Sequence, residues 1–138
     1  MSQLSKDILS TLSNSLKQSQ EFIERCHNFD RSCKTKYTQE CDIQVDKDII
    51  DADILLESVE KLSDLLLVHL QKCTMQPCVD ASNDCKAACN DLMNSINDLI
   101  SYCKEEENKC ASRYQDVKTA CENFEKKAKV CNDNYCNM

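Results

Sequence analysis

Residues 62–89 read LSDLLLVHLQKCTMQPCVDASNDCKAAC, and this stretch decides the fold. Apolar residues recur every three or four positions on both sides of Pro77, a period typical of amphipathic helices. Because the residue before a proline avoids the α region, one helix is expected to end near residue 75 and the next to begin near Cys78. The stretch therefore predicts two antiparallel helices that meet at a proline turn and carry cysteines on their core faces.

The same period runs through the rest of the chain and predicts helices near residues 4–44, 48–75, 78–104 and 108–136. Asp46 or Asp48 is the expected N-cap of the second helix. The apolar stripes keep their phase across the first and third boundaries, so a long two-helix antiparallel coiled-coil hairpin turning at Pro77 is the alternative. Such a hairpin would bury little apolar surface by itself. We therefore predict an all-α, disulfide-stapled antiparallel four-helix bundle, with residues 1–138 forming a single domain.

Composition excludes several classes of function. The chain has 138 residues, no glycine and a net charge of −7. Loops that cradle phosphates need glycine, so P-loop and dinucleotide-binding enzymes are excluded, and an acidic surface disfavours nucleic acid as a partner. No apolar run approaches the roughly 18 residues of a membrane span. Residues 1–7 lack the apolar segment of a secretory signal, so no signal peptide is expected within this numbering.

Twelve cysteines in 138 residues is a density typical of disulfide scaffolds. All twelve fall on the predicted apolar faces, so their thiols are expected to face one another. Their even number allows complete pairing, and we predict up to six structural disulfides in an oxidising environment. The expected disulfide cysteines are Cys26, Cys33, Cys41, Cys73, Cys78, Cys85, Cys89, Cys103, Cys110, Cys121, Cys131 and Cys136.

In an up-and-down bundle, the direction of each helix sorts these cysteines into two sets. The set toward one end contains Cys26, Cys33, Cys41, Cys103, Cys110 and Cys121. The set toward the other end contains Cys73, Cys78, Cys85, Cys89, Cys131 and Cys136. No disulfide is expected to join the two sets.

Metal binding is the alternative role for the cysteines. A thiol-lined bundle can store a soft metal such as Cu(I), and this chain resembles bacterial copper-storage bundles in outline. Those bundles repeat a Cys-x-x-x-Cys pair, which occurs here only at Cys85 and Cys89. The other metal hypothesis is one zinc site, in which two pairs of ligands each share a helix face. Its ligands would be His69, Cys73, Cys85 and Cys89.

Nine residues separate Cys121 from Cys131. This pair resembles half of the twin Cys-x9-Cys motif of mitochondrial intermembrane-space proteins, which are helical hairpins oxidised after import without a cleaved signal. The resemblance covers only residues 121–131, and the second pair of the motif is missing. It implies the intermembrane space as one oxidising location, beside secretion and the virion.

The first predicted helix is longer than the other three. Its first turns, residues 1–17, are therefore expected to overhang the bundle. An exposed apolar stripe of this kind marks an interface, either with a protein groove or with a second copy in a homo-oligomer. The expected partner-binding residues are Leu4, Ile8, Leu9, Leu12 and Leu16.

Catalysis is not expected. The two histidines, His27 and His69, lie on different predicted helices, and no Cys-x-x-Cys redox pair occurs. We predict a non-enzymatic structural or protein-interaction module without a cofactor, acting as part of an assembly in an oxidising compartment. The alternative is a thiol-rich helical bundle that stores or binds copper or zinc.

Overall fold

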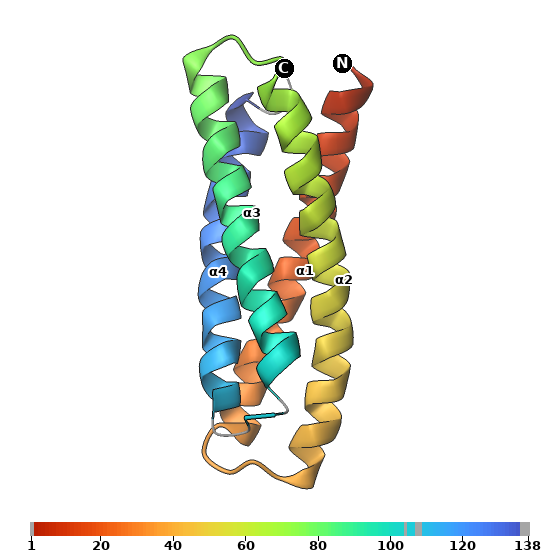
Figure 1. The fold of residues 1–138 in the computed structure, drawn as a ribbon, viewed down its shortest axis with the longest axis vertical. Helices are drawn as coiled ribbons and strands as arrows, with labels where there is room; N and C mark the ends of the chain where they lie inside the picture. Colours follow the sequence, from red (N-terminus) through yellow and green to blue (C-terminus); the bar gives the residue numbers. More distant parts are fainter. Residues whose placement is uncertain (1, 104, 107–108, 136–138) are drawn as a thin grey trace.

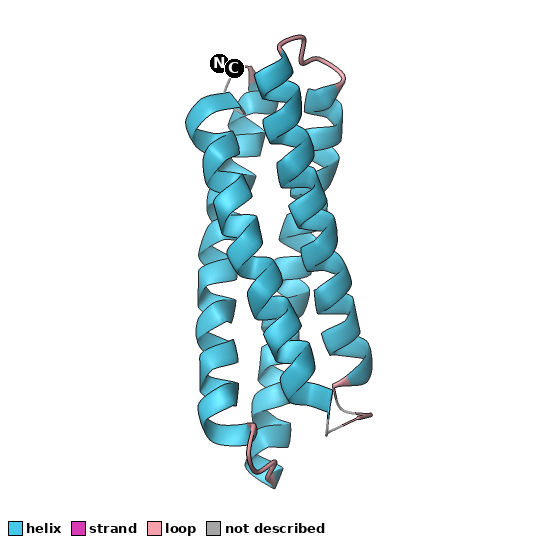
Figure 2. Ribbon diagram, turned by 90° about the vertical axis from the view of Figure 1, so that its left-hand side faces the viewer, coloured by secondary structure: helices cyan, strands magenta, loops and turns pink. Residues whose placement is uncertain are grey.

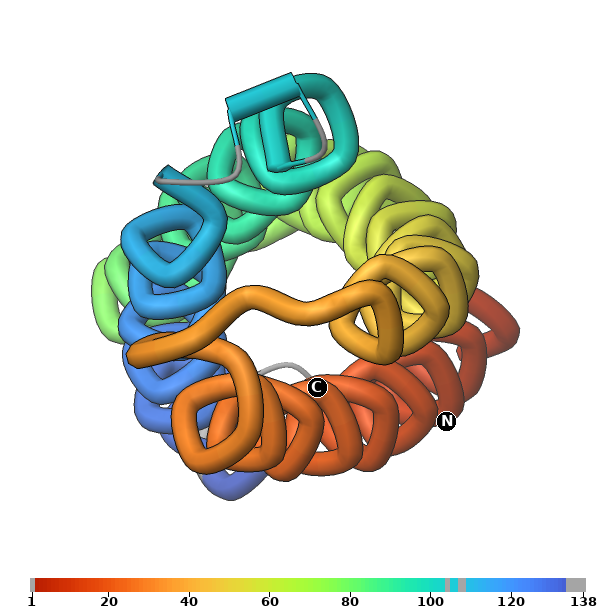
Figure 3. Tube along the Cα trace, turned by 90° about the horizontal axis from the view of Figure 1, so that it is seen from below, coloured from red at the N-terminus to blue at the C-terminus, as the bar shows by residue number. Residues whose placement is uncertain are grey.

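A computed structural model of the chain describes residues 2–103, 105–106 and 109–135. Consecutive helices run antiparallel in a long bundle (Figure 1). Viewed along the bundle, each helix packs against its sequence neighbours, and α1 closes the ring against α4 (Figure 3). The predicted disulfide-stapled four-helix bundle is confirmed. Its elements are α1 (Gln3–Cys33), α2 (Gln39–Leu70), α3 (Gln76–Tyr102), α4 (Cys110–Val130) and a final π-helical turn, η2 (Cys131–Tyr135).

The ends of the helices follow local chemistry. Ser2 is the N-cap of α1, and its hydroxyl accepts a hydrogen bond from the Ser5 N–H at 3.1 Å. Pro77 lies in the first turn of α3, where its fixed φ suits a helix and its missing N–H would have no helical partner. The break expected before Pro77 is present, because α2 ends at Leu70. The loops of the described chain are short and lie at the two ends of the bundle (Figure 2).

The turn between α1 and α2 lies earlier than the sequence predicted. α1 ends at Cys33 rather than near residue 44. The pattern concealed this turn because Cys33, Tyr37 and Cys41 keep a four-residue spacing although the chain reverses between them. The Tyr37 hydroxyl donates a hydrogen bond to the Asp42 carboxylate at 2.7 Å where α2 begins. The two-helix hairpin is therefore wrong, since it needs one continuous helix through residues 34–38.

The expected N-cap of α2 is also wrong. Asp46 and Asp48 both lie inside α2, and Thr38 occupies the N-cap position. The side chain of Asp48 is turned into the bundle and is only 1% exposed. A carboxylate at this position therefore serves packing and polar contacts rather than the start of a helix.

Residues 2–17 do not overhang the bundle. The expectation of an overhang followed from the misplaced first turn. α1 and α2 are in fact 31 and 32 residues long, so α2 can cover α1 along its whole length. Ile8 and Leu12 are fully buried, Leu4 and Leu16 pack against the core, and Leu9 is half-buried. The exposed leucine stripe that was expected to bind a partner is absent from this part of the chain.

An aromatic layer joins the first and last helices. Tyr114 of α4 stacks on Phe29 of α1 with ring centroids 4.0 Å apart, and Phe22 of α1 lies 6.3 Å from the same ring. Burial of each ring contributes about 1.5–3 kcal/mol. Between α1 and α2, the buried hydroxyls of Ser15 and Ser58 are hydrogen-bonded to each other. None of the helices in the described ranges combines the length and the hydropathy that a membrane span requires.

Candidate functional site

Disulfides close the turns of the bundle. Three bridges within the described residues each span one interhelical turn, with Cα separations of 6.0, 6.2 and 4.5 Å, which lie within the usual range for disulfides. Both cysteines of each bridge come from the same predicted set, so the sorting by helix direction is confirmed for these pairs. The bridges are Cys33–Cys41, Cys73–Cys78 and Cys103–Cys110.

The remaining cysteines do not all pair as expected. Cys131 is disulfide-bonded as well, and Cys136 lies outside the described residues. Four cysteines that were expected in disulfides are instead free and buried: Cys26, Cys85, Cys89 and Cys121. Cys85 and Cys89 lie one turn apart on α3, where Cβ atoms are about 5–6 Å from each other and a disulfide needs about 3.5–4.5 Å. The free Cys121 also departs from the oxidised hairpin implied by the Cys-x9-Cys resemblance.

Burial makes the free thiols poor nucleophiles. Burial raises the pKa of Cys26 far above its usual value, and the neighbouring Cys121 adds to that shift. Burial also raises the pKa of Cys121 to about 12, against a smaller opposing effect of the Ser19 hydroxyl. The pKa of Cys89 is raised by its hydrogen bond with Cys85 and by burial. Thiolate, the form that attacks electrophiles and binds metals, is therefore scarce at neutral pH, and these residues pack as small apolar side chains.

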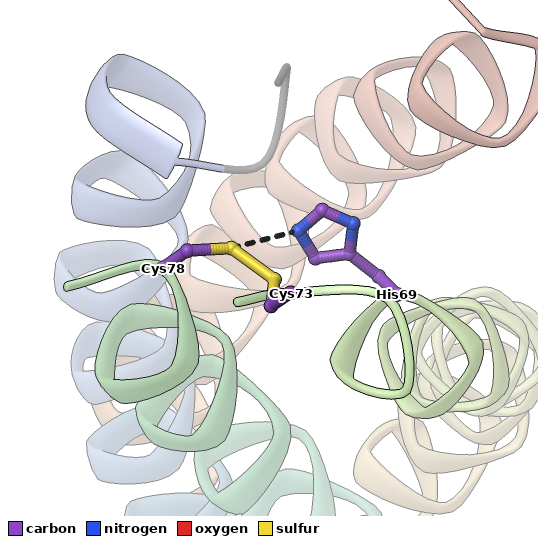
Figure 4. Close-up of side chains that lie close together, drawn as sticks. All are labelled: His69, Cys73 and Cys78. Atoms are coloured by element: carbon purple, nitrogen blue, oxygen red, sulfur yellow. Dashed lines mark hydrogen bonds between the residues drawn. A yellow bond between two sulfur atoms is a disulfide. The ribbon is translucent and has the colours of Figure 1, made fainter. Parts of the chain in front are cut away.

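Three metal-ligating side chains come together at the turn between α2 and α3 (Figure 4). His69 lies in the last turn of α2, Cys73 lies in the connecting loop, and Cys78 lies in the first turn of α3. Their ligand atoms all lie within 4.8 Å of one another. The His69 Nε2 is 3.3 Å from the Cys78 Sγ. Because a disulfide sulfur carries no proton, the imidazole N–H must be the donor in this contact.

The predicted zinc ligands are only partly brought together. The structure places His69 beside Cys73, with Cys78 as the third member in place of Cys85 and Cys89. The reason is the turn, which sets the first residues of α3 against the end of α2. Cys85 and Cys89 lie two and three helical turns further along α3. The cysteine directly after Pro77 was the signal that would have identified the third residue.

A pocket of about 260 Å³ opens beside this cluster. Its walls include Ser2, Leu4 and Ser5 from the start of α1, and Lys72 and Cys73 from the turn. Cys73 is half-buried, whereas its partner Cys78 and the cysteines of the other two bridges are at most 4% exposed. Small molecules can therefore approach this disulfide more readily than the other two.

The buried carboxylate of Asp48, which the sequence suggested only as an N-cap, joins α1, α2 and α4. The Tyr114 hydroxyl donates a hydrogen bond to Asp48 at 2.6 Å, and an Arg25 nitrogen lies 3.4 Å from the same carboxylate. Arg25 also pairs with the half-exposed Asp51 at 2.5 Å. Burial raises the pKa of Asp48 above its usual value, although Tyr114 and Arg25 oppose the shift. These contacts fix the relative positions of the three helices.

Comparison of the chain with protein-family models, with characterised proteins and with solved structures finds no match. The geometry of the bundle and its cysteines therefore carries the functional proposal alone.

Proposed function

We propose that this chain is a non-enzymatic structural or protein-interaction module that works as part of an assembly in an oxidising compartment. The observation that carries the proposal is the disulfide at each of the three interhelical turns. A chain of 138 residues can bury a substantial core without cross-links. The bridges therefore add resistance to unfolding beyond what the core supplies.

The proposed location follows from the same bridges. Disulfides of this kind persist in secreted proteins and on virion surfaces, where thiols are not kept reduced. The mitochondrial intermembrane space is the further location that the Cys121-x9-Cys131 resemblance implies. The proposal covers these oxidising compartments as a class.

The absence of catalysis is part of the proposal and has two supports. The free thiols are buried, and the pKa values of Cys26 and Cys121 are raised, which suppresses nucleophilic attack. His27 lies near the end of α1 and His69 near the end of α2, so the antiparallel helices hold the two histidines at opposite ends of the bundle. A nucleophile with a positioned base is therefore not assembled from these residues.

Exposed apolar side chains on α2 support the proposed role in protein interaction. Ile43, Ile50 and Ile54 are 56%, 63% and 47% exposed, although isoleucine is usually buried. The leucines at the start of α1 cannot serve as the contact in this state, because Ile8 and Leu12 lie in the core. Sedimentation of the full oxidised chain at increasing concentration tests whether the assembly includes a second copy.

Disulfide mapping of the native protein tests the proposal directly. Accessible thiols are alkylated at lysis, the protein is digested without reduction, and the linked peptides are identified by mass spectrometry. We expect Cys33–Cys41, Cys73–Cys78 and Cys103–Cys110 to be recovered as linked pairs. Recovery of all these turn cysteines as thiols would contradict an oxidising location and favour the alternative of copper or zinc binding.

A further inference from the structure

The turn between α2 and α3 differs from the other two disulfide-closed turns in the chemistry around its sulfurs. Only this turn adds an imidazole to the two cysteines within the described residues. At the α1–α2 turn, the contacts of the Cys41 sulfur are instead the Thr38 hydroxyl and the backbone carbonyls of Ser32 and Lys36. Two thiolates and one imidazole form a donor set typical of zinc.

The distances within the cluster fit a tetrahedral ion with little rearrangement. With zinc–nitrogen and zinc–sulfur bonds of about 2.0–2.1 and 2.3 Å, the nitrogen–sulfur edge of the tetrahedron is about 3.6 Å and the sulfur–sulfur edge about 3.8 Å. The His69 Nε2 already lies 3.3 Å from the Cys78 Sγ. The two sulfurs need only separate from bonding distance. Cys73 lies in the loop rather than in either helix, so it can move without disturbing α2 or α3.

We propose that His69, Cys73 and Cys78 form a redox-gated zinc site, closed by the disulfide when oxidised and able to bind one Zn²⁺ when reduced. This inference goes beyond the structural role proposed above and does not depend on it. The pocket of about 260 Å³ provides the route for the ion and space for a fourth ligand such as water. The site therefore has three protein ligands and one open position.

The conversion between the two states is a thiol–disulfide exchange with a dithiol reductant. A thiolate of the reductant attacks the more accessible Cys73 Sγ, and the electrons of the S–S bond leave with the Cys78 Sγ. The His69 N–H that faces this sulfur stabilises the departing thiolate. The second thiol of the reductant then resolves the mixed disulfide, which leaves two protein thiols and an oxidised cyclic reductant. Zn²⁺ displaces the two thiol protons, and the His69 proton moves to Nδ1 so that Nε2 can bind the metal.

Metal titration of the full-length chain tests this proposal. The chain is reduced with a dithiol, freed of reductant by anaerobic gel filtration, and titrated with Co²⁺ as a spectroscopic probe. We expect one equivalent of Co²⁺ to give thiolate charge-transfer absorption and the d–d bands of a tetrahedral site, and Zn²⁺ to displace it. The oxidised chain should show neither signal. A reduced chain that binds no Co²⁺ would overturn the proposal.

Matched variants locate the bound ion, because reduction also frees cysteines elsewhere. His69→Ala should weaken binding by at least about tenfold, since even loss of a residue that supports a ligand costs about 10–100-fold. His27→Ala is the matched control and should bind as the wild type does. Cys78→Ser supplies a second ligand deletion of nearly unchanged volume, and helical circular dichroism shows which variants fold.

The double variant Cys85→Ala/Cys89→Ala separates this site from the thiol pair in the middle of α3. It should retain the full affinity for Co²⁺ and Zn²⁺. Equal binding by wild type, His69→Ala and Cys78→Ser, or loss of binding in the Cys85→Ala/Cys89→Ala variant alone, would place the ion elsewhere and overturn the proposal.

Discussion

The cysteines at the ends of the bundle and those in its middle occupy the same apolar stripes but are in different chemical states. Cys103 and Cys110 flank a turn, are fully buried and form a disulfide. Cys85 and Cys89 are equally buried in the middle of α3 and remain thiols. Burial is therefore not what separates the two groups. Chain reversal brings two cysteine backbones together at each turn, whereas a regular helix holds its own cysteines slightly too far apart.

The difference implies that the ends and the middle of the bundle are stabilised in different ways. The ends are held by covalent cross-links that act mainly on the unfolded chain. The middle is held by packing, in which a thiol counts as a small apolar group. Reduction should therefore lower the stability contributed by the disulfides at the ends of the bundle and leave the stability contributed by packing in the middle unchanged.

Reduction of all disulfides should have the largest effect. The bridges in the described chain span 8, 5 and 7 residues. Loop-closure entropy assigns about 2–2.5 kcal/mol to each, and their combined loss should lower the melting temperature by roughly 20–30 °C. Thermal circular dichroism with and without a reductant measures the shift, and intact mass verifies the reduction. An unchanged melting curve after complete reduction would contradict this comparison, because the disulfides would then contribute nothing to the free energy of unfolding.

A pair of double variants separates the ends from the middle at equal burial. Cys103→Ala/Cys110→Ala removes a bridge, and Cys85→Ala/Cys89→Ala removes two free thiols. Under oxidising conditions the first variant should lose about 2 kcal/mol more than it loses under reducing conditions. The second should lose the same amount in both, since only packing changes. Urea unfolding of both variants in the two conditions measures this, and a redox-dependent loss in the second variant would show that the middle thiols also pair.

Some helix boundaries could be predicted from the sequence and others could not, depending on whether a local residue preference or only apolar periodicity marked them. The break at Pro77 was visible because proline acts through local stereochemistry, whatever the tertiary fold. The turn after Cys33 was not visible, because it uses neither glycine nor proline and the four-residue spacing continues through it. That one error also produced the false overhang of the N-terminal leucines. A stripe that keeps its phase shows which residues are apolar, but it does not show whether the helix continues.

The candidate site could be predicted only where its residues share a helical face or a short turn. His69 and Cys73 were found through their spacing, but Cys78 joins them through a loop conformation that spacing does not encode. The sequence places Asp48 at a helix end because aspartate is a preferred N-cap residue. It is buried here because Tyr114, 66 residues away in the sequence, donates a hydrogen bond to it. Contacts across such distances are invisible to periodicity.

Removal of the Tyr114 hydroxyl tests how far the packing of α1, α2 and α4 depends on one buried polar contact. Tyr114→Phe deletes the 2.6 Å hydrogen bond and leaves a buried carboxylate with fewer partners. We expect a loss of about 1–3 kcal/mol in the free energy of unfolding. Tyr37→Phe is the matched control, because it removes a 2.7 Å hydrogen bond to Asp42 at a less buried turn. Urea unfolding measures both, and an equal or greater loss in the control would contradict the role assigned to Asp48.

The raised pKa of Asp48 predicts a smaller, pH-dependent effect. Its folded form holds a proton more tightly than its unfolded form, because burial disfavours the carboxylate. Its contribution to stability is complete below the ordinary aspartate pKa of about 3.9 and is lost as the pH rises through the higher folded value. Asp48→Asn should therefore gain stability relative to the wild type as the pH increases from 4 to 7. Urea unfolding at several pH values gives the slopes for the wild type, for Asp48→Asn and for Asp53→Asn, a matched substitution at an exposed position of the same helix.

We expect very little alkylation when the oxidised chain is exposed to an alkylating reagent at neutral pH. The four free thiols are buried, and the pKa values of Cys26, Cys89 and Cys121 are raised, so the helices must separate before these side chains react. Their labelling should be much slower than that of the unfolded chain, because the side chains are buried and the reactive thiolate is scarce in the folded state. Mass spectrometry over time measures the count and position of labelled cysteines. Simultaneous labelling of all four would show that the middle opens as one unit. Early labelling of Cys26 and Cys121, before Cys85 and Cys89, would instead place the weakest contact between α1 and α4, the pair of neighbouring helices that no interhelical turn connects.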